Sequence, residues 1–116
     1  MSAIPVLRII DLVEAEMFYC DALNFTVDWR WREAVGKPVF MQISRDDIRL
    51  YLTERDECTV GTLVYLYVDN VDEWHRSILK REVGVDALPQ DKPWGNREMQ
   101  IRDPDGNRLR ICSVIK

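Results

Sequence analysis

The residues that could do acid–base or nucleophilic chemistry form no recognisable catalytic pair in this sequence. His75 is the sole histidine and lies in a stretch with helical spacing, where a surface position is its ordinary role. Glu98 is the best candidate for a general base, because a carboxylate near Arg110 can be buried and tuned, but no second carboxylate or histidine accompanies it. Cys112 has no histidine to activate its thiol. These residues point to binding more than to catalysis.

Residues 93–111 contain the strongest local pattern and predict a β-hairpin. Two segments with period-2 alternation flank the turn D-P-D-G-N at 103–107, where proline presets φ and glycine accepts a positive φ. Alternation then assigns the side chains to two faces. The apolar face holds Met99, Ile101, Leu109 and Ile111, and the polar face holds Glu98, Gln100, Arg102, Arg108 and Arg110. We expect the first face to pack on a core and the second to meet water or a ligand.

Composition limits the class of protein. The chain has 116 residues, of which 47% are hydrophobic and 31% charged, which suits one domain with a real core. A net charge of -4 without basic blocks gives no support to nucleic-acid binding. No apolar run approaches the ~18 residues of a membrane span, and the start lacks a signal-peptide layout. Three cysteines without CxxC spacing favour reduced thiols. We expect a cytoplasmic protein that binds neither nucleic acid nor membrane.

The first half of the chain predicts the order strand, helix and three strands. An apolar segment at 3–10 contains Pro5, which favours an edge or an exchanged strand. Asp11 is a helix N-cap with Glu14 as its capping-box partner, and the helix runs to about residue 23. Its expected buried stripe consists of Val13, Met17 and Cys20, with Phe18 as a further candidate. Strands follow at 25–33, 38–44 and 48–53, and a charged linker occupies 54–61.

The second half repeats this plan. A strand at 62–69 precedes a helix that is capped by Asn70 with Glu73 and ends near Gly84, and Trp74, Ile78 and Leu79 form its expected buried stripe. A strand at 85–88 and the hairpin complete it. Corresponding residues of the two halves are separated by about half the chain, which indicates an internal duplication; the matches are Leu7 with Leu66, Asp11 with Asn70 and Glu14 with Glu73. The fold class is α+β: two βαβββ modules, 1–55 and 62–116, within one domain 1–116.

The chain resembles the glyoxalase/bleomycin resistance protein superfamily, also called vicinal oxygen chelate. The resemblance rests on I-P-V-L-R at 4–8, D-L-x-x-A-x-x-F-Y at 11–19 and P-W-G-N-R-E-M-Q-I-R-D-P-D-G-N at 93–107, and it covers essentially the whole sequence. The W-G-x-R-E stretch and the A-I-P-V-L start are most similar to bleomycin resistance proteins. The resemblance implies a mixed curved sheet that encloses a cleft, with helices on its convex side.

In the superfamily's metalloenzymes, the resemblance implies, His and Glu ligands lie on the first and last strands of each module. The corresponding positions here are Ile4, Tyr51, Leu63 and Arg110. Two are hydrocarbons, one is a neutral phenol and one is a permanent cation, so none suits a divalent metal. We therefore expect no metal, no cofactor and no family-type catalysis.

A cleft at these positions is rich in aromatic and arginine side chains. Strand alternation extends the set, and the candidate ligand-binding residues are Trp29, Trp31, Arg49, Tyr51, Tyr65, Tyr67, Trp94, Glu98 and Arg110. Flat rings stack on planar ligands, adding about 1 kcal/mol beyond burial. Alternatives remain open: Trp29 and Trp31 equally suit a core or an interface, Tyr65 and Tyr67 suit cross-strand packing, and the arginines suit ordinary ion pairs.

Bleomycin resistance proteins sequester their drug without changing it, in a cleft lined by two chains that exchange N-terminal strands. By resemblance we expect the same here: a non-catalytic small-molecule binder and a homodimer in which Pro5 helps the first strand to leave its own chain. The ligand is a bleomycin-like drug or, because the arginines oppose a cation and favour a carboxylate or phosphate, an anionic metabolite. The alternative is a superfamily enzyme, a lyase, isomerase or dioxygenase, that uses Glu98, Tyr51 or Arg110 or holds a metal at other positions.

Overall fold

The computed structural model describes residues 1–81 and 83–116 and contains the two expected modules. Each module is a four-stranded mixed sheet, with the strand order β1-β4-β3-β2 in the first and β5-β8-β7-β6 in the second. The first module comprises β1 (Val6–Arg8), α1 (Leu12–Glu16), η1 (Met17–Ala22), β2 (Thr26–Trp31), β3 (Phe40–Arg45) and β4 (Ile48–Thr53). The second comprises β5 (Leu63–Tyr67), α2 (Val71–Ile78), η2 (Leu79–Arg81), β6 (Val85–Asp91), β7 (Asn96–Arg102) and β8 (Arg108–Val114).

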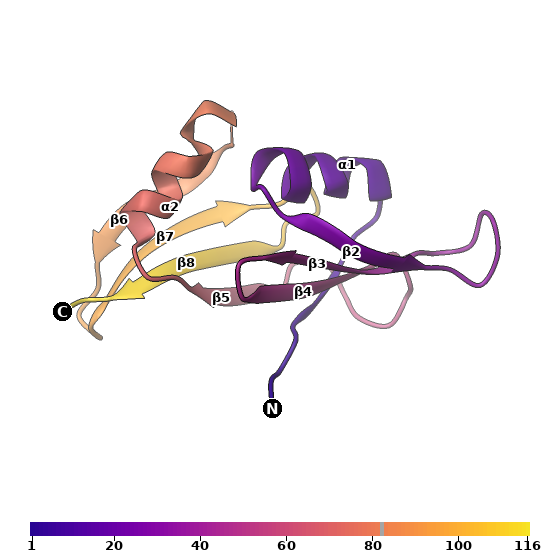
Figure 1. Ribbon diagram of the computed structural model, residues 1–116, viewed down its shortest axis with the longest axis horizontal. Coiled ribbons are helices and arrows are strands. Elements are labelled where there is room, and N and C mark those ends of the chain that lie inside the picture. Colours follow the sequence, from indigo (N-terminus) through magenta and orange to yellow (C-terminus); the bar gives the residue numbers. More distant parts are fainter. Residues whose placement is uncertain (82) are drawn as a thin grey trace.

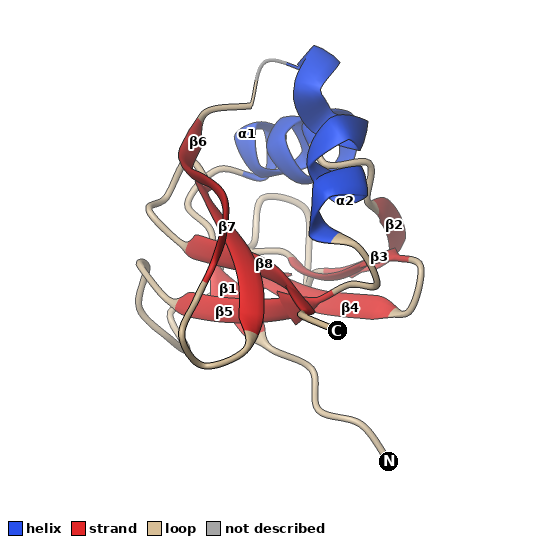
Figure 2. Ribbon diagram, turned by 90° about the vertical axis from the view of Figure 1, so that its left-hand side faces the viewer, coloured by secondary structure: helices blue, strands red, loops and turns tan. Residues whose placement is uncertain are grey.

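Both helices lie on the same side of the sheets (Figures 1 and 2), so each sheet has a helix face and an opposite face, which we call the open face. A single cluster of buried apolar side chains on the helix side joins the two modules. The N-terminal residues leave the first sheet on the side away from the helices (Figure 1). No helix among the described residues is long and apolar enough to cross a membrane.

The hairpin of β7 and β8 forms as its alternation predicts. Met99 pairs with Ile111 and Gln100 with Arg110, so the apolar and polar sets face opposite sides of the sheet. Met99, Ile101, Leu109 and Ile111 are buried on the helix face. Glu98 lies on the open face and yet is only 3% exposed, so the carboxylate that the sequence suggested can be buried is indeed buried.

The first helix begins at its predicted cap but buries a different stripe. The Asp11 carboxylate accepts hydrogen bonds from the backbone N–H groups of residues 13 and 14. Val13 and Met17, expected in the core, are 66% and 59% exposed. Ala15 and Tyr19, which lie one helical turn apart, are buried instead, and the Tyr19 phenol has a hydrogen-bond partner in the other module.

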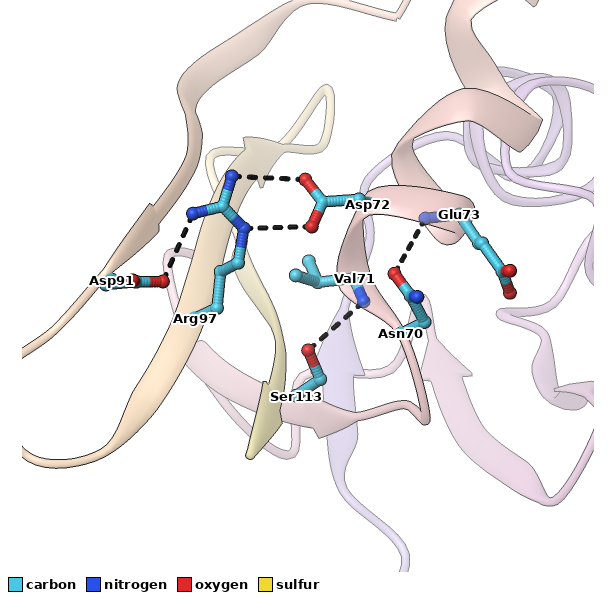
Figure 3. A network of polar contacts seen from close by, with 7 residues as sticks. All are labelled: Asn70, Val71, Asp72, Glu73, Asp91, Arg97 and Ser113. Atoms are coloured by element: carbon cyan, nitrogen blue, oxygen red, sulfur yellow. Dashed lines mark hydrogen bonds and ion pairs between the residues drawn. The ribbon is translucent and has the colours of Figure 1, made fainter. Parts of the chain in front are cut away.

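The second helix is fixed at its N-terminus, as Figure 3 shows. The side chain of Asn70 accepts a hydrogen bond from the backbone N–H of Glu73. Arg97 on β7 donates two hydrogen bonds to Asp72 and a third to Asp91. The hydrogen bonds from Arg97 hold the pKa of Asp72 below its usual value. The helix is thereby fastened to the sheet by a bidentate ion pair.

The buried stripe of α2 is only partly the predicted one. Val71, Trp74 and Ile78 are buried, whereas Leu79 is exposed, because the helix changes to the 3₁₀ turn η2 at that residue and the next apolar position rotates away from the core. The predicted helix extends over Glu82, which lies outside the described residues.

The D-P-D-G-N turn joins the two modules through a buried polar network. One Asp103 carboxylate oxygen accepts hydrogen bonds from the Tyr19 hydroxyl (2.7 Å) and from the Asn107 amide (2.8 Å). The Asn107 amide also donates to the carbonyl of Arg8, and its oxygen accepts from the backbone N–H groups of residues 61 and 62. A turn in the second module therefore holds the first helix, the first strand and the linker.

A β-bulge in β2 decides where the tryptophans lie. Val27 pairs with Ile43, the register then shifts at Asp28, and Trp29 pairs with Gln42. The Asp28 carboxylate accepts hydrogen bonds from Gln42 and Ser44, which stabilise the extra residue. Without this bulge Trp29 would lie on the same face as Val27, whereas with it Trp29 and Trp31 share the open face, as alternation between these two residues predicts.

We predict that Tyr19→Phe lowers the free energy of unfolding at pH 7 by about 2 kcal/mol, because a buried hydrogen bond to a carboxylate is lost. Burial, followed by the charge of Asp103, raises the pKa of Tyr19 in the folded state. The phenol therefore stabilises the fold fully below the pKa of an unfolded tyrosine, about 10, and this stabilisation is lost as the pH rises further. The difference between the two proteins should shrink from pH 7 to pH 11, as measured by urea denaturation.

A matched control is Tyr51→Phe. It removes the hydroxyl of a half-buried tyrosine on the open face and should change the free energy of unfolding little at pH 7. A difference between wild type and Tyr19→Phe that stays constant across this pH range would show that Tyr19 does not titrate differently in the folded protein.

Candidate functional site

The open face of the first sheet carries a group of aromatic rings, which we call the aromatic cluster: Trp29, Phe40 and Tyr51. The Trp29 and Phe40 rings are stacked with centroids 6.0 Å apart, and the Tyr51 ring lies 5.6 Å from Trp29 and 5.0 Å from Phe40. Three neighbouring strands supply one ring each, so the cluster is held by the register of β2, β3 and β4. Trp29 is 41% exposed, so part of its surface remains available to a ligand.

Two other predicted residues border this cluster. Trp31 is 52% exposed on the same face, and the guanidinium of Arg55 lies 5.7 Å from its ring centroid. Arg49 on β4 donates a hydrogen bond to the hydroxyl of Ser2 in the N-terminal segment. The first sheet thus presents flat apolar surface with guanidinium groups at its border.

The open face of the second sheet carries a polar group centred on Glu98, which we call the Glu98 cluster: Tyr65, Tyr67, Trp94, Asn96, Glu98 and Arg110. One Glu98 carboxylate oxygen accepts hydrogen bonds from the Trp94 indole (2.7 Å) and the Asn96 amide (3.2 Å). The other accepts from the Tyr65 hydroxyl (3.3 Å). These three donors explain how a carboxylate can be buried without an ion-pair partner among the described residues.

The remaining members of the cluster are held by the same network. Arg110 donates to the Tyr65 hydroxyl (2.9 Å) and to Gln100 (3.0 Å), and its guanidinium lies 5.6 Å from the Tyr65 ring centroid. The amide of Asn96 also donates to the Tyr67 hydroxyl. Trp94 is fixed at its indole nitrogen while its ring is 61% exposed, so it presents an oriented flat surface.

Cys112 lies beneath the Glu98 cluster on β8. It pairs with Glu98 across the strands and is fully buried. Burial, followed by the negative charge of Glu98, raises the pKa of its thiol to about 11. The group therefore stays protonated at neutral pH and is a weak nucleophile.

All nine predicted ligand-binding residues lie on or beside the open faces, but a single chain does not gather them into one site. Among the described residues, no hydrogen bond or aromatic contact joins the aromatic cluster to the Glu98 cluster. Sequence reasoning missed Phe40, Asn96 and Gln100. Pairing β3 with β4 through the turn at 45–47 would have placed Phe40 beside Tyr51, whereas the roles of Asn96 and Gln100 depend on tertiary contacts.

The positions that correspond to metal ligands are separated in the same way. Tyr51 belongs to the aromatic cluster, Arg110 to the Glu98 cluster, and Leu63 pairs with Arg108. His75 lies on α2, which covers the helix face of the second sheet. The described part of the chain contains no group of three or more His, Cys, Asp or Glu residues with the spacing of a metal site.

Two mixed sheets built from tandem βαβββ modules, with helices on one side, define the class of fold, and the sequence identifies the family. The chain belongs to the glyoxalase superfamily: the family described as "Glyoxalase superfamily protein" matches residues 1–116. No curated protein matches the sequence.

Solved structures of antibiotic-binding proteins have the same fold. The bleomycin resistance determinant encoded on the transposon Tn5 is 22% identical, with 98% of each chain covered and a TM-score of 0.81. The bleomycin-binding protein from Streptomyces verticillus, in complex with copper(II)-bleomycin, is 28% identical, with 96% of this chain and 93% of that chain covered and a TM-score of 0.76. TnmS3, an antibiotic-binding protein from Streptomyces sp. CB03234, is 24% identical, with 98% and 97% covered and a TM-score of 0.75.

We predict that the hydrogen bond between Trp94 and Glu98 is visible in the indole N–H resonances. A short, charge-assisted bond should move the Trp94 signal downfield of the other three tryptophans, and Glu98→Leu should return it upfield without moving the signals of Trp29 and Trp31. A nitrogen–proton correlation spectrum measures both, and Trp94→Phe assigns the signal. An indole signal that is unchanged in Glu98→Leu would contradict this contact.

Proposed function

We propose that this protein binds and sequesters a planar small molecule without changing it, in a cleft that two copies of the chain form together. The observation that carries the proposal is the pair of open faces. Each bears half of a binding surface, with ring surface on one and an oriented indole with polar groups on the other. A two-fold dimer that places the first sheet of one copy opposite the second sheet of the other would join the halves into two equivalent clefts.

The N-terminal segment supports the dimer. β1 pairs with β4 of its own chain over only three residues, and Pro5 before it cannot donate to the ladder. Residues 1–3 are exposed and lead away from the helices beyond the open face (Figure 2). Such a segment can reach a neighbouring copy, and exchange of β1 between the copies would cover the edges of both sheets. Exposed Val6 and Leu63 on the open faces would then be buried at the interface.

The nature of the ligand is supported by the exposed rings and by the solved relatives. Trp29, Trp31 and Trp94 offer flat surfaces on which a heteroaromatic group can stack. Proteins of the same fold and similar sequence bind bleomycin. Glu98 is engaged by three hydrogen-bond donors, and among the described residues no second carboxylate and no histidine forms a hydrogen bond or ion pair with it, which favours binding over catalysis.

Titration of tryptophan fluorescence with metal-free bleomycin tests ligand binding. We expect saturable quenching at about one drug per chain and a weaker effect in Trp94→Ala, because the oriented indole is lost. Trp74→Phe is the matched control, since Trp74 is buried on the helix face. The drug should be recovered unchanged by mass spectrometry, whereas conversion to a product would favour the alternative of a superfamily enzyme. No response up to about 100 μM would exclude bleomycin as the ligand.

Light scattering with size-exclusion chromatography tests the dimer. The full chain should have twice the monomer mass at about 10 μM, and a variant that lacks residues 2–5 should shift towards monomer because the exchanged segment is shortened. A matched control is Val35→Ser, which changes an exposed residue in the loop between β2 and β3. A full chain that stays monomeric up to about 100 μM would contradict the composite cleft.

A further inference from the structure

The open face of the second sheet contains a small pocket beside the Glu98 cluster. It has a volume of about 180 Å³, and its lining residues include Lys92, Trp94, Glu98, Gln100 and Arg110. Complete pockets for drug-sized ligands measure roughly 300–1,000 Å³, so a pocket of this size suits one end of a larger molecule.

The side chains that line this pocket carry more positive than negative charge. Lys92 and Arg110 contribute two cationic groups, with the Lys92 ammonium 5.9 Å from the Trp94 ring centroid. Glu98 contributes the one carboxylate of the lining, and its two oxygens already accept hydrogen bonds from three side chains. A cationic ligand would therefore meet an occupied acceptor and two like charges, whereas an anion would meet two cations.

Arg110 is oriented for an anion by its neighbours. Its Nε and Nη1 atoms donate to Gln100 and Tyr65, and among the described residues its Nη2 atom has no hydrogen-bond partner. Within the part of the chain that the structure describes it also forms no ion pair, in contrast to Arg102 on the same face, which is paired with Asp86 at 3.0 Å. A guanidinium held at two nitrogens, with the third free, is a preorganised donor for a carboxylate or sulfonate.

We infer that Arg110 and Lys92 form an anion subsite, so that the ligand is a planar aromatic compound carrying a carboxylate or sulfonate group. The aromatic part stacks on the exposed face of Trp94, and the acidic group meets the free N–H donors of Arg110. This inference rests on the proposed binding function and goes beyond it, because it specifies the charge of the ligand.

A pair of probes that differ in charge tests the inference by titration calorimetry: 2-naphthoate and 2-naphthylmethylammonium. We expect 2-naphthoate to bind at least about tenfold more tightly, because its carboxylate gains charge-assisted hydrogen bonds that the ammonium probe cannot form. Arg110→Gln should weaken naphthoate binding by about tenfold and leave the ammonium probe unaffected. Lys92→Gln, which leaves the bonds among Tyr65, Gln100 and Glu98 in place, should weaken it less. Arg102→Gln is the control and should have no effect, since its charge is already paired.

The other possible results of these titrations would each refute a specific part of the inference. Equal binding of the two probes, or tighter binding of the ammonium probe, would refute the anion subsite while leaving the binding function intact. Anion preference that survives both Arg110→Gln and Lys92→Gln would refute its assignment to this pocket. If neither probe binds at about 1 mM while bleomycin does, the anion subsite is refuted and the proposed binding function stands. If bleomycin also gives no response and the chain is monomeric, the proposed function is refuted as well.

Discussion

The buried contact between Tyr19 and Asp103 holds the two modules in one arrangement, and the positions of the open faces follow from it. Asp103 lies in a hairpin turn of the second module, yet its carboxylate accepts hydrogen bonds from the first helix and from Asn107, which in turn binds the first strand and the linker. A buried carboxylate without these donors would cost several kcal/mol, so the network is either complete or strongly destabilising. Modules that each leave a sheet half covered are therefore joined by polar contacts as well as by the shared apolar core.

The two open faces are held in place by different kinds of contact. In the first sheet, a bulge at Asp28 places two tryptophans on the face that the helices leave uncovered, and packing between Trp29, Phe40 and Tyr51 keeps the rings in place. In the second sheet, hydrogen bonds to Glu98 hold the side chains in place. One open face is thus held through ring packing and the other through a polar network. The two faces therefore differ in chemistry, which two identical modules would not.

Local patterns predicted much of this architecture. Turn chemistry and period-2 alternation placed the hairpin and its two faces, and the capping residues Asp11 and Asn70 placed the helix starts, because these signals depend on near neighbours. The buried side of the first helix could not be predicted, since the choice between Val13 with Met17 and Ala15 with Tyr19 depends on a partner 84 residues away. For the same reason the donors that accompany the burial of Glu98 could not be predicted, since they come from two strands and a turn. Whether such a side chain is buried is decided by partners far away in the sequence rather than by local propensity.

The thiol of Cys112 has a consequence for the kind of compound this surface can tolerate. With a pKa of about 11 the thiol stays protonated at neutral pH, and the side chain is fully buried beneath the Glu98 cluster. This thiol is therefore a poor target for electrophilic or oxidising compounds, although it lies directly beneath the hydrogen-bonded face of the second sheet. A modification that would enlarge this side chain, and so disturb the hydrogen bonds of Glu98 above it, is thus disfavoured.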